Sequence, residues 1–207
     1  MPIQQDLIDA AKSGMTWKAY MDLFERLVAE GRTTGPDQSE GLLTYTKLNL
    51  SRSRRWNKTL KVLPGMENGL SIHGPQTWLV LTECWCGDAA QCNPIIAALA
   101  ERTPGVTLRF ILRDENLAIM DRYLTNGGRS IPKLIAWDDA TREELFTWGP
   151  RPAGAQVIYS EYLAQPVDQR DGEAMKEQLH RWYFDDAGVS VQKEMLALME
   201  HTEVVKN

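Results

Sequence analysis

The sequence predicts an α/β protein in which helices flank a mixed central sheet. In the middle of the chain, short apolar runs alternate with helical patterns in the order strand, helix, strand, helix, strand, strand and helix, which favours a mixed sheet covered on both faces. Amphipathic helical patterns also precede and follow this region. We expect a helical N-terminal extension over residues 1–62, an α/β core over 63–165 and a helical C-terminal extension over 166–207, in one compact unit.

The N-terminal part carries two helical patterns. The first covers residues 15–30, where apolar side chains recur at three- and four-residue steps and Thr16 or Ser13 is available as a cap. The second covers about 39–60 and ends in a basic face. That face either is a solvated helix surface or forms a patch for an anion or a partner. Its basic residues are Arg52, Arg54, Arg55, Lys58 and Lys61.

Four apolar segments predict the strands of the core. The first, residues 77–82, is a continuous apolar run that suits a strand buried on both faces. The others follow at 106–112, 133–137 and 144–148, and an Asp-Asp turn joins the last two. Helices are expected at 88–102, 116–124, 153–165, 172–185 and 189–202.

The composition is that of a soluble globular protein, with 43% hydrophobic and 25% charged residues. The net charge of −5 argues against nucleic acid or an anionic membrane as the main partner. The chain has neither a basic region followed by an apolar core at its start nor an apolar run that spans a bilayer, so we expect a cytoplasmic protein. Its three cysteines all lie between positions 84 and 92, which indicates a site instead of a disulfide framework.

Cys86 stands where an apolar strand gives way to a helix. A helix start exposes unpaired N–H groups and the positive end of the helix dipole, so a thiol placed there is stabilised as the thiolate. The thiolate is the nucleophile in disulfide chemistry. Gly87 allows a close approach to the sulfur because it has no side chain. Cys86 is therefore the first candidate catalytic residue.

The turn Trp85-Cys86-Gly87 resembles that of the thioredoxin superfamily, which reads Trp-Cys-Gly-x-Cys. Pro94, eight residues after Cys86, matches a helix proline of that family. Pro132, 46 residues after Cys86, begins a strand and matches the family's cis proline, which faces the thiol. Because a cis X-Pro bond is uncommon in folded proteins, the resemblance makes a specific structural prediction here.

The resemblance covers roughly residues 63–165 and implies a thioredoxin-like fold. The segments 112–117, 126–132 and 148–152, together with the helical N-terminal extension, resemble a bacterial thioredoxin-like group. By position in the family pattern, five residues are expected to border the thiol and bind substrate. They are Trp85, Gly87, Ile131, Pro132 and Arg129.

Three positions depart from the family pattern. Ala89 stands where the family has its second, resolving cysteine, so the two-cysteine cycle cannot close there. Val80 stands where typical thioredoxins bury an Asp that assists the resolving cysteine, and the two losses agree with each other. Asp88, and also Glu83, place carboxylates near Cys86, which opposes ionisation of its thiol. We expect Cys86 to be less acidic than the thiol of a standard oxidoreductase.

Two further cysteines are candidates to resolve Cys86. Cys92 lies six residues along the helix, about 9 Å of axial rise away, whereas a disulfide needs Cα atoms within about 7 Å. We expect Cys92 to pack as a small apolar residue. Cys84 lies two residues before Cys86, and side chains two apart in an extended segment share a face. A Cys84–Cys86 bridge would be strained and easily reduced, and it makes Cys84 the second candidate catalytic residue.

Other constellations are weaker. His73, His180 and His201 lie far from the cysteines and lack ligand spacing, so we expect no metal and no cofactor. Arg113 and Arg129 either bind a substrate carboxylate, such as that of glutathione, or pair with neighbouring carboxylates.

Two functions of different classes follow. The first is a thiol-disulfide oxidoreductase in which Cys86 attacks a disulfide and either Cys84 or an external thiol such as glutathione resolves it. Its partners would be protein disulfides or low-molecular-weight thiols. The second is a non-catalytic module in which the surface around Trp85, Cys86 and Pro132 binds an extended peptide of a partner protein.

Overall fold

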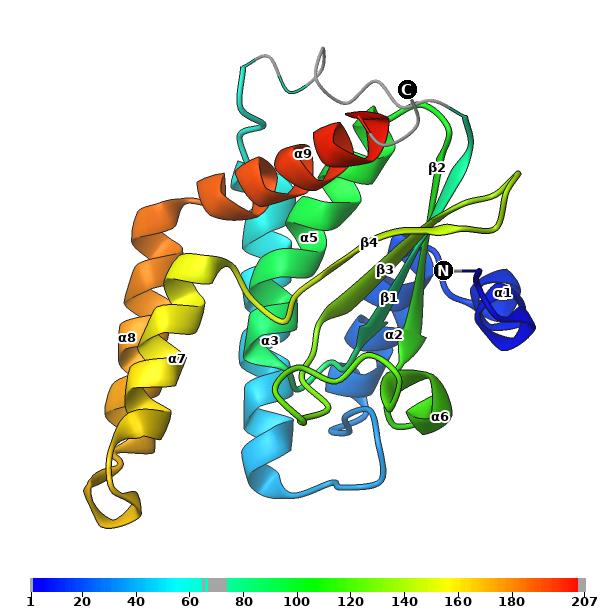
Figure 1. The fold of residues 1–207 in the computed structure, drawn as a ribbon. Helices are drawn as coiled ribbons and strands as arrows, with labels where there is room; N and C mark the ends of the chain where they lie inside the picture. Colours follow the sequence, from blue (N-terminus) through cyan, green and yellow to red (C-terminus); the bar gives the residue numbers. More distant parts are fainter. Residues whose placement is uncertain (1, 65, 67–73, 205–207) are drawn as a thin grey trace.

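The computed structural model describes residues 2–64, 66 and 74–204. Its centre is a four-stranded sheet with the strand order β2-β1-β3-β4 (Figure 1). The strands are β1 (Gln76–Thr82), β2 (Val106–Leu112), β3 (Lys133–Asp138) and β4 (Glu144–Trp148). β1 and β2 are parallel, whereas β3 runs antiparallel to both β1 and β4. The mixed sheet flanked by helices confirms the predicted α/β class.

Helices cover both faces of this sheet (Figure 1). On one face, Trp78 and Val80 of β1 belong to a core cluster with side chains from several helices, including four that precede or follow the segment 153–186. These four helices are α2 (Trp17–Ala29), α3 (Glu40–Thr59), α5 (Gly87–Arg102) and α9 (Val189–Val204). Leu79 and Leu81 face the opposite side, where α1 and α6 pack. Their bounds are Gln5–Ser13 and Leu117–Met120. All seven residues of β1 are buried as a result, which agrees with its continuous apolar run.

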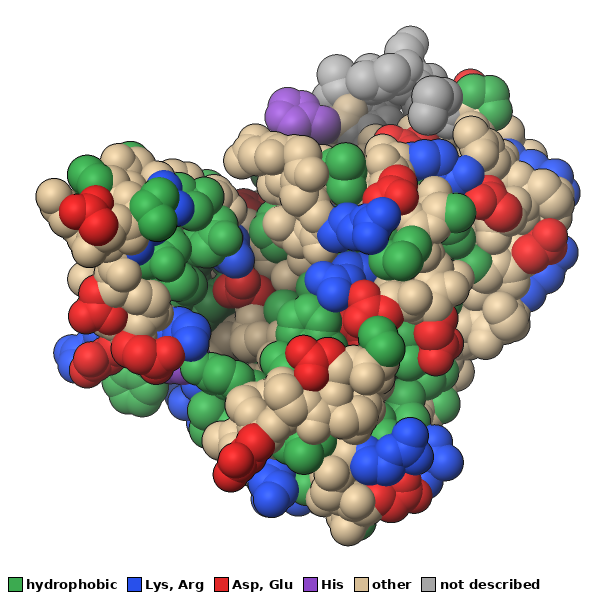
Figure 2. All heavy atoms as spheres, turned by 90° about the horizontal axis from the view of Figure 1, so that it is seen from below, with side chains coloured by type: hydrophobic (Ala, Val, Ile, Leu, Met, Phe, Trp, Pro, Cys, Tyr) green, Lys and Arg blue, Asp and Glu red, His purple; other side chains and the backbone are tan. Residues whose placement is uncertain are grey.

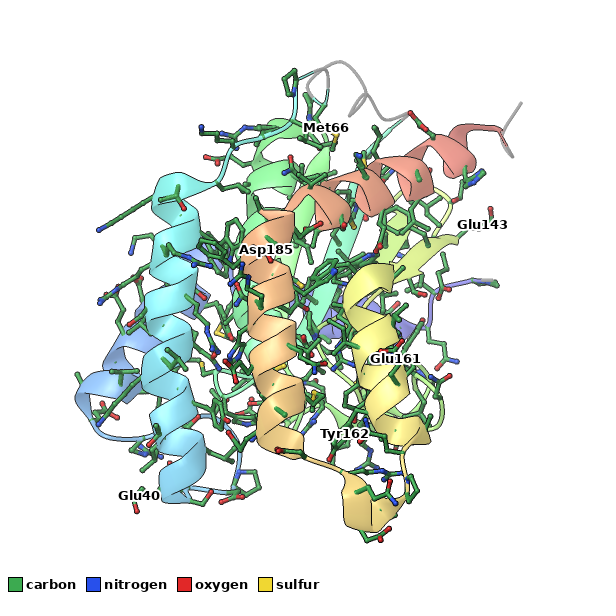
Figure 3. All side chains as sticks on the ribbon, turned by 90° about the vertical axis from the view of Figure 1, so that its left-hand side faces the viewer. Glu40, Met66, Glu143, Glu161, Tyr162 and Asp185 are labelled. Carbon is green, nitrogen blue, oxygen red and sulfur yellow. The ribbon has the colours of Figure 1, made fainter. Side chains whose placement is uncertain are left out.

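The C-terminal part adds a helical hairpin at the edge of the molecule. α7 (Ala153–Ala164) and α8 (Gly172–Asp186) are joined through a short 3-10 helix at Val167–Gln169. Figure 3 shows α3, α8 and α7 side by side, with α8 in the middle. The hairpin lies at the side of the molecule next to α3 (Figure 1), and its residues line a cavity together with the start of α5.

Most element bounds agree with the sequence-based expectation. Of the two candidate caps, Thr16 is the one that caps α2, because its hydroxyl accepts from the Ala19 N–H at 3.2 Å. The expectation for residues 116–124 was wrong in length, since the helix ends at Met120 and the chain turns before Thr125 pairs with Gly128. α1 was missed altogether, although its buried Leu7 and Ala11 lie four residues apart. Within the described residues, none of the helices has the length and apolar character needed to cross a membrane.

Candidate functional site

Cys86 caps the N-terminus of α5, where the family resemblance placed it. Its Sγ accepts a hydrogen bond from the Ala89 N–H at 3.4 Å and donates one to the Ile131 carbonyl at 3.2 Å. The Ile131-Pro132 bond is cis, which confirms the prediction for this segment. The start of α5 and the cis-proline segment thus contact each other through the Cys86 sulfur.

The Cys86 thiol is buried, with 8% of the residue exposed. Burial, and after it the nearby Asp88 carboxylate, raise its pKa from 9.0 to about 12. The Ala89 N–H and the Arg151 guanidinium act in the opposite direction but are weaker. Cys86 is therefore a protonated thiol at neutral pH in this conformation, in line with the expectation of a weakly acidic group.

Asp88 is held by residues that the sequence reading did not connect with it. Arg151 binds its carboxylate through Nε at 3.0 Å and Nη2 at 2.5 Å, and the Tyr183 hydroxyl donates to Oδ1 at 2.7 Å. The side chains of Asp88 and Arg151 are only 12% and 10% exposed. Arg151 precedes α7 and Tyr183 lies on α8, so Asp88 ties both parts of the hairpin to the start of α5. The Arg151 guanidinium also stacks over Tyr159, 4.3 Å from the ring centre.

Cys84 is fully buried and packs apart from Cys86. It packs in the same core cluster as Tyr20, whereas Cys86 packs in the cluster that contains Ala89 and Ile131. Cys84 and Trp85 form a turn instead of extended strand, so the expected shared face for the two thiols is absent. The structure does not bring these two candidate residues together.

The surroundings of Cys84 suit a structural role. Its N–H donates to the Thr34 hydroxyl at 3.0 Å, and its carbonyl accepts from the Asn49 side chain at 3.1 Å. Burial raises the pKa of its thiol to about 12, with a further contribution from the buried Glu83 carboxylate. Glu83 thus raises the pKa of Cys84, while Asp88 is the carboxylate that raises the pKa of Cys86.

Cys92 is fully buried against the helical side of the core. Its Sγ lies 3.8 Å from the Tyr183 hydroxyl. Its packing matches the expectation of a small apolar residue. All three cysteines are free thiols in the structure.

The two arginines expected near the thiol pair with local carboxylates. Arg129 forms two hydrogen bonds with Asp121, at 2.6 and 2.9 Å, and is half exposed. Arg113 forms an ion pair of 2.7 Å with Asp114, and its guanidinium lies over Trp85, 4.8 Å from the ring centre. In the structure, Arg113 and Arg129 therefore pair with neighbouring carboxylates, which is one of the two alternatives that the sequence left open.

A cavity of about 240 Å³ opens beside Cys86, between α3, the start of α5 and the α7–α8 hairpin. Figure 2 shows a hollow between the hairpin and the rest of the molecule, with many hydrophobic side chains at its surface. Among the site residues expected from the sequence, Cys86, Trp85 and Gly87 contribute to the wall, while Arg129, Ile131 and Pro132 do not. The remaining lining residues are Tyr45, Arg52, Asp88, Arg151, Tyr159, Met175, Lys176, Leu179, His180 and Tyr183.

Arg52 and His180 meet across this cavity. Arg52 Nη2 lies 2.7 Å from His180 Nε2, and Nη1 donates to the Asn49 side-chain oxygen at 2.8 Å. Burial and the neighbouring Arg52 lower the pKa of His180. From the sequence, Arg52 belongs to a basic helix face that is either solvated or a patch for an anion or a partner, and His180 is considered only as a metal ligand. The contact between α3 and α8 could not be read from either helix alone.

Metal binding finds no support in the part of the chain that the structure describes. Within it, no group of three or more His, Cys, Asp or Glu side chains is arranged to hold a metal ion. His73, which the sequence analysis considered, lies outside the described residues.

Comparison with known proteins agrees with this architecture. A family model described as thioredoxin matches residues 35–165. Two solved structures share the fold at 15% sequence identity. One is a protein of unknown function from Pseudomonas aeruginosa (TM-score 0.56, covering 90% of this chain and 98% of that chain). The other is an HIV epitope scaffold (TM-score 0.54, covering 90% of this chain and 99% of that chain).

No match was found among curated proteins. The family model covers 131 of the 207 residues (from 35 to 165), including the turn that carries Cys86 and the cis bond before Pro132. Because that match extends over more than half of the chain, the chain belongs to the thioredoxin family.

Proposed function

We propose that the protein is a thiol-disulfide oxidoreductase that uses Cys86 as its single reacting thiol. The observation that carries this proposal is the position of the Cys86 sulfur, which caps α5 and also lines the cavity. A disulfide bound in the cavity would meet a sulfur atom at a helix start, where the Ala89 N–H lowers the pKa of the thiol against the larger opposite effect of burial.

The exchange has two steps. Cys86 loses its proton to solvent, its sulfur attacks one sulfur of the substrate disulfide, and the other half leaves as a thiolate that takes up a proton. An external low-molecular-weight thiol then attacks the mixed disulfide, which restores the Cys86 thiol and forms a new disulfide. External resolution fits the geometry, since Ala89 has no thiol and Cys84 packs in a different core cluster.

A non-catalytic binding module is the second candidate. The observation that favours it is the burial of Cys86, which raises the pKa of the thiol to about 12. With such a pKa, the thiolate amounts to only about one molecule in 10⁵ at pH 7. In this alternative, the surface around Trp85, Cys86 and Pro132 binds a partner without electron transfer.

Reduction of 2-hydroxyethyl disulfide by glutathione separates the two functions. Wild type, Cys86→Ser and Cys84→Ser are compared at several pH values between 7 and about 9.5, because the thiolate fraction rises with pH. The oxidoreductase predicts turnover that increases with pH, is lost in Cys86→Ser and persists in Cys84→Ser. Absence of turnover in the wild type throughout this pH range would instead reject the oxidoreductase and favour the binding module.

A further inference from the structure

We propose that the cavity beside Cys86 binds a small thiol or disulfide that carries a carboxylate, and that Arg52, supported by His180, binds this carboxylate. This inference rests on the proposed exchange at Cys86 and names the substrate class. It follows from the charges on the cavity wall, the volume of the cavity and its position beside Cys86.

Arg52 is a cation with neutral partners. Its two described side-chain partners are Asn49, at 2.8 Å, and His180, at 2.7 Å. The ion pairs among the described residues do not include it. An arginine stays protonated in a protein, and its planar guanidinium binds carboxylates through paired hydrogen bonds. A half-buried guanidinium without a carboxylate partner therefore attracts an anionic ligand.

The other charges on the cavity wall are compensated. Arg151 is bound to Asp88 at 2.5 Å, and Lys176 forms an ion pair of 2.6 Å with Glu173. Arg52 is thus the lining cation whose charge remains for a ligand. The aliphatic and aromatic part of the wall, which includes Trp85, Met175 and Leu179, suits the carbon skeleton between a sulfur and a carboxylate.

One ligand can reach both Arg52 and Cys86. A Cβ atom built on Gly87, the residue after Cys86, would lie 3.8 Å from Arg52 Nη1. Gly87 therefore lies next to the guanidinium and, along the chain, directly after the thiol. The cavity volume of about 240 Å³ lies below the range of about 300–1,000 Å³ typical of pockets for drug-sized ligands, which favours a small metabolite over a loop of a folded protein.

The carboxylate contact would orient the substrate for the exchange. With the carboxylate on Arg52, one sulfur of the disulfide is held near Cys86, whose sulfur forms the new S–S bond as the old one breaks. The departing half leaves as a thiolate and takes a proton from solvent, so the exchange is balanced without any further oxidant or reductant.

Three disulfides of similar length and different charge test this inference. They are 3,3′-dithiodipropionate (anionic), 2-hydroxyethyl disulfide (neutral) and cystamine (cationic). The rate of mixed-disulfide formation on Cys86 is measured for each by intact-protein mass spectrometry at one pH and one ionic strength. Each rate is divided by the rate of the same disulfide with free 2-mercaptoethanol, because the three leaving thiols differ in pKa. The variants are Arg52→Gln, Arg52→Lys and the control Lys58→Gln, which removes one positive charge from an exposed position on the same helix.

In the wild type, we expect the anionic disulfide to react at least about tenfold faster than the cationic one, because the uncompensated guanidinium attracts it. Arg52→Gln should bring this ratio close to one. Arg52→Lys should retain part of the preference, and Lys58→Gln should retain all of it.

The outcomes distinguish the two proposals. If none of the three disulfides modifies Cys86 in the wild type, the proposed oxidoreductase itself fails. If all three modify Cys86 at similar rates, the exchange stands and the carboxylate site is overturned. This wild-type comparison needs no variant, so it decides the matter even if Arg52→Gln does not fold. A preference that survives in folded Arg52→Gln would also overturn the role of Arg52.

Discussion

The Asp88 carboxylate and the Arg151 guanidinium form an ion pair of 2.5 Å that is nearly closed off from solvent. Asp88 is the second residue after Cys86, and Arg151 comes from the loop that leads into α7. The pair therefore connects the hairpin to the site of the thiol and, at the same time, offsets the charge that most opposes ionisation of Cys86 after burial itself. The same ion pair therefore affects both the stability of the fold and the pKa of the Cys86 thiol.

Asp88→Asn and Arg151→Gln should change the pKa of Cys86 in opposite directions. Asp88 raises that pKa and Arg151 lowers it, so the first substitution favours the thiolate and the second opposes it. At a fixed pH near 8.5, alkylation by iodoacetamide should be at least about threefold faster in Asp88→Asn and slower in Arg151→Gln than in the wild type. A change in the same direction in both variants would show that opening of the hairpin, not charge, controls the reactivity.

Tyr183→Phe should destabilise the protein without removing a ring from the core. The substitution deletes the hydroxyl that donates to Asp88 at 2.7 Å from a residue only 4% exposed. A hydrogen bond to a charged group contributes about 1.5–3 kcal/mol, so the free energy of unfolding in urea should fall by about 2 kcal/mol. Tyr162→Phe, at a more exposed position on α7, serves as the control and should stay within about 0.5 kcal/mol. Equal effects of the two substitutions would contradict the role given to the Tyr183 hydroxyl.

Gly149→Ala should disturb the cis-proline segment. Gly149 has φ +109°, and a Cβ atom there would lie 2.2 Å from the Pro132 carbonyl oxygen. Because that oxygen belongs to the backbone, Pro132 must move, and we expect a loss of about 3 kcal/mol in the free energy of unfolding. Gly127→Ala is a matched control, with φ +77° and open space around the added carbon, and should lose only about 1 kcal/mol. Similar losses in both variants would exclude the clash with Pro132 as the cause.

Stability should decrease as the pH rises above about 9. The pKa of Cys86 is raised from 9.0 to about 12, so the folded state keeps its proton in a range where the unfolded chain has lost it. The stabilisation is complete below pH 9 and is lost as the pH rises toward 12. Between pH 9 and about 11, the free energy of unfolding should decline with pH in the wild type and less steeply in Cys86→Ser. The two slopes should differ by up to about 1.4 kcal/mol per pH unit. Parallel pH profiles for the two proteins would contradict the raised pKa.

The part of the site that depends on local sequence was predictable. A strand followed by Trp85-Cys86-Gly87 and a helix placed the thiol at the start of α5, and the cis bond before Pro132 was also expected. What could not be predicted depends on contacts between distant segments. Arg52 and His180 are separated by 128 residues, and periodicity describes only which face of each helix is apolar, not which helices meet.

The relation between Cys84 and Cys86 shows the same limit at short range. A spacing of two residues predicts a shared face only if the backbone is extended. Here β1 ends at Thr82, and the following turn directs Cys84 and Cys86 into different core clusters. The apolar run of β1 and its end at Thr82 were visible in the sequence, but no Gly or Pro among residues 83–85 marked the turn at Cys84 and Trp85.

The most direct test is to identify which thiol forms a mixed disulfide with a small disulfide. Wild type, Cys86→Ser, Cys84→Ser and Cys92→Ser are incubated with 3,3′-dithiodipropionate at pH 8.5, and the modified peptide is located by mass spectrometry. We predict a single modification on Cys86, which is retained in Cys84→Ser and Cys92→Ser and lost in Cys86→Ser. Modification of Cys84 or Cys92 in the folded wild type, or the persistence of a modified peptide in Cys86→Ser, would contradict Cys86 as the single reacting thiol.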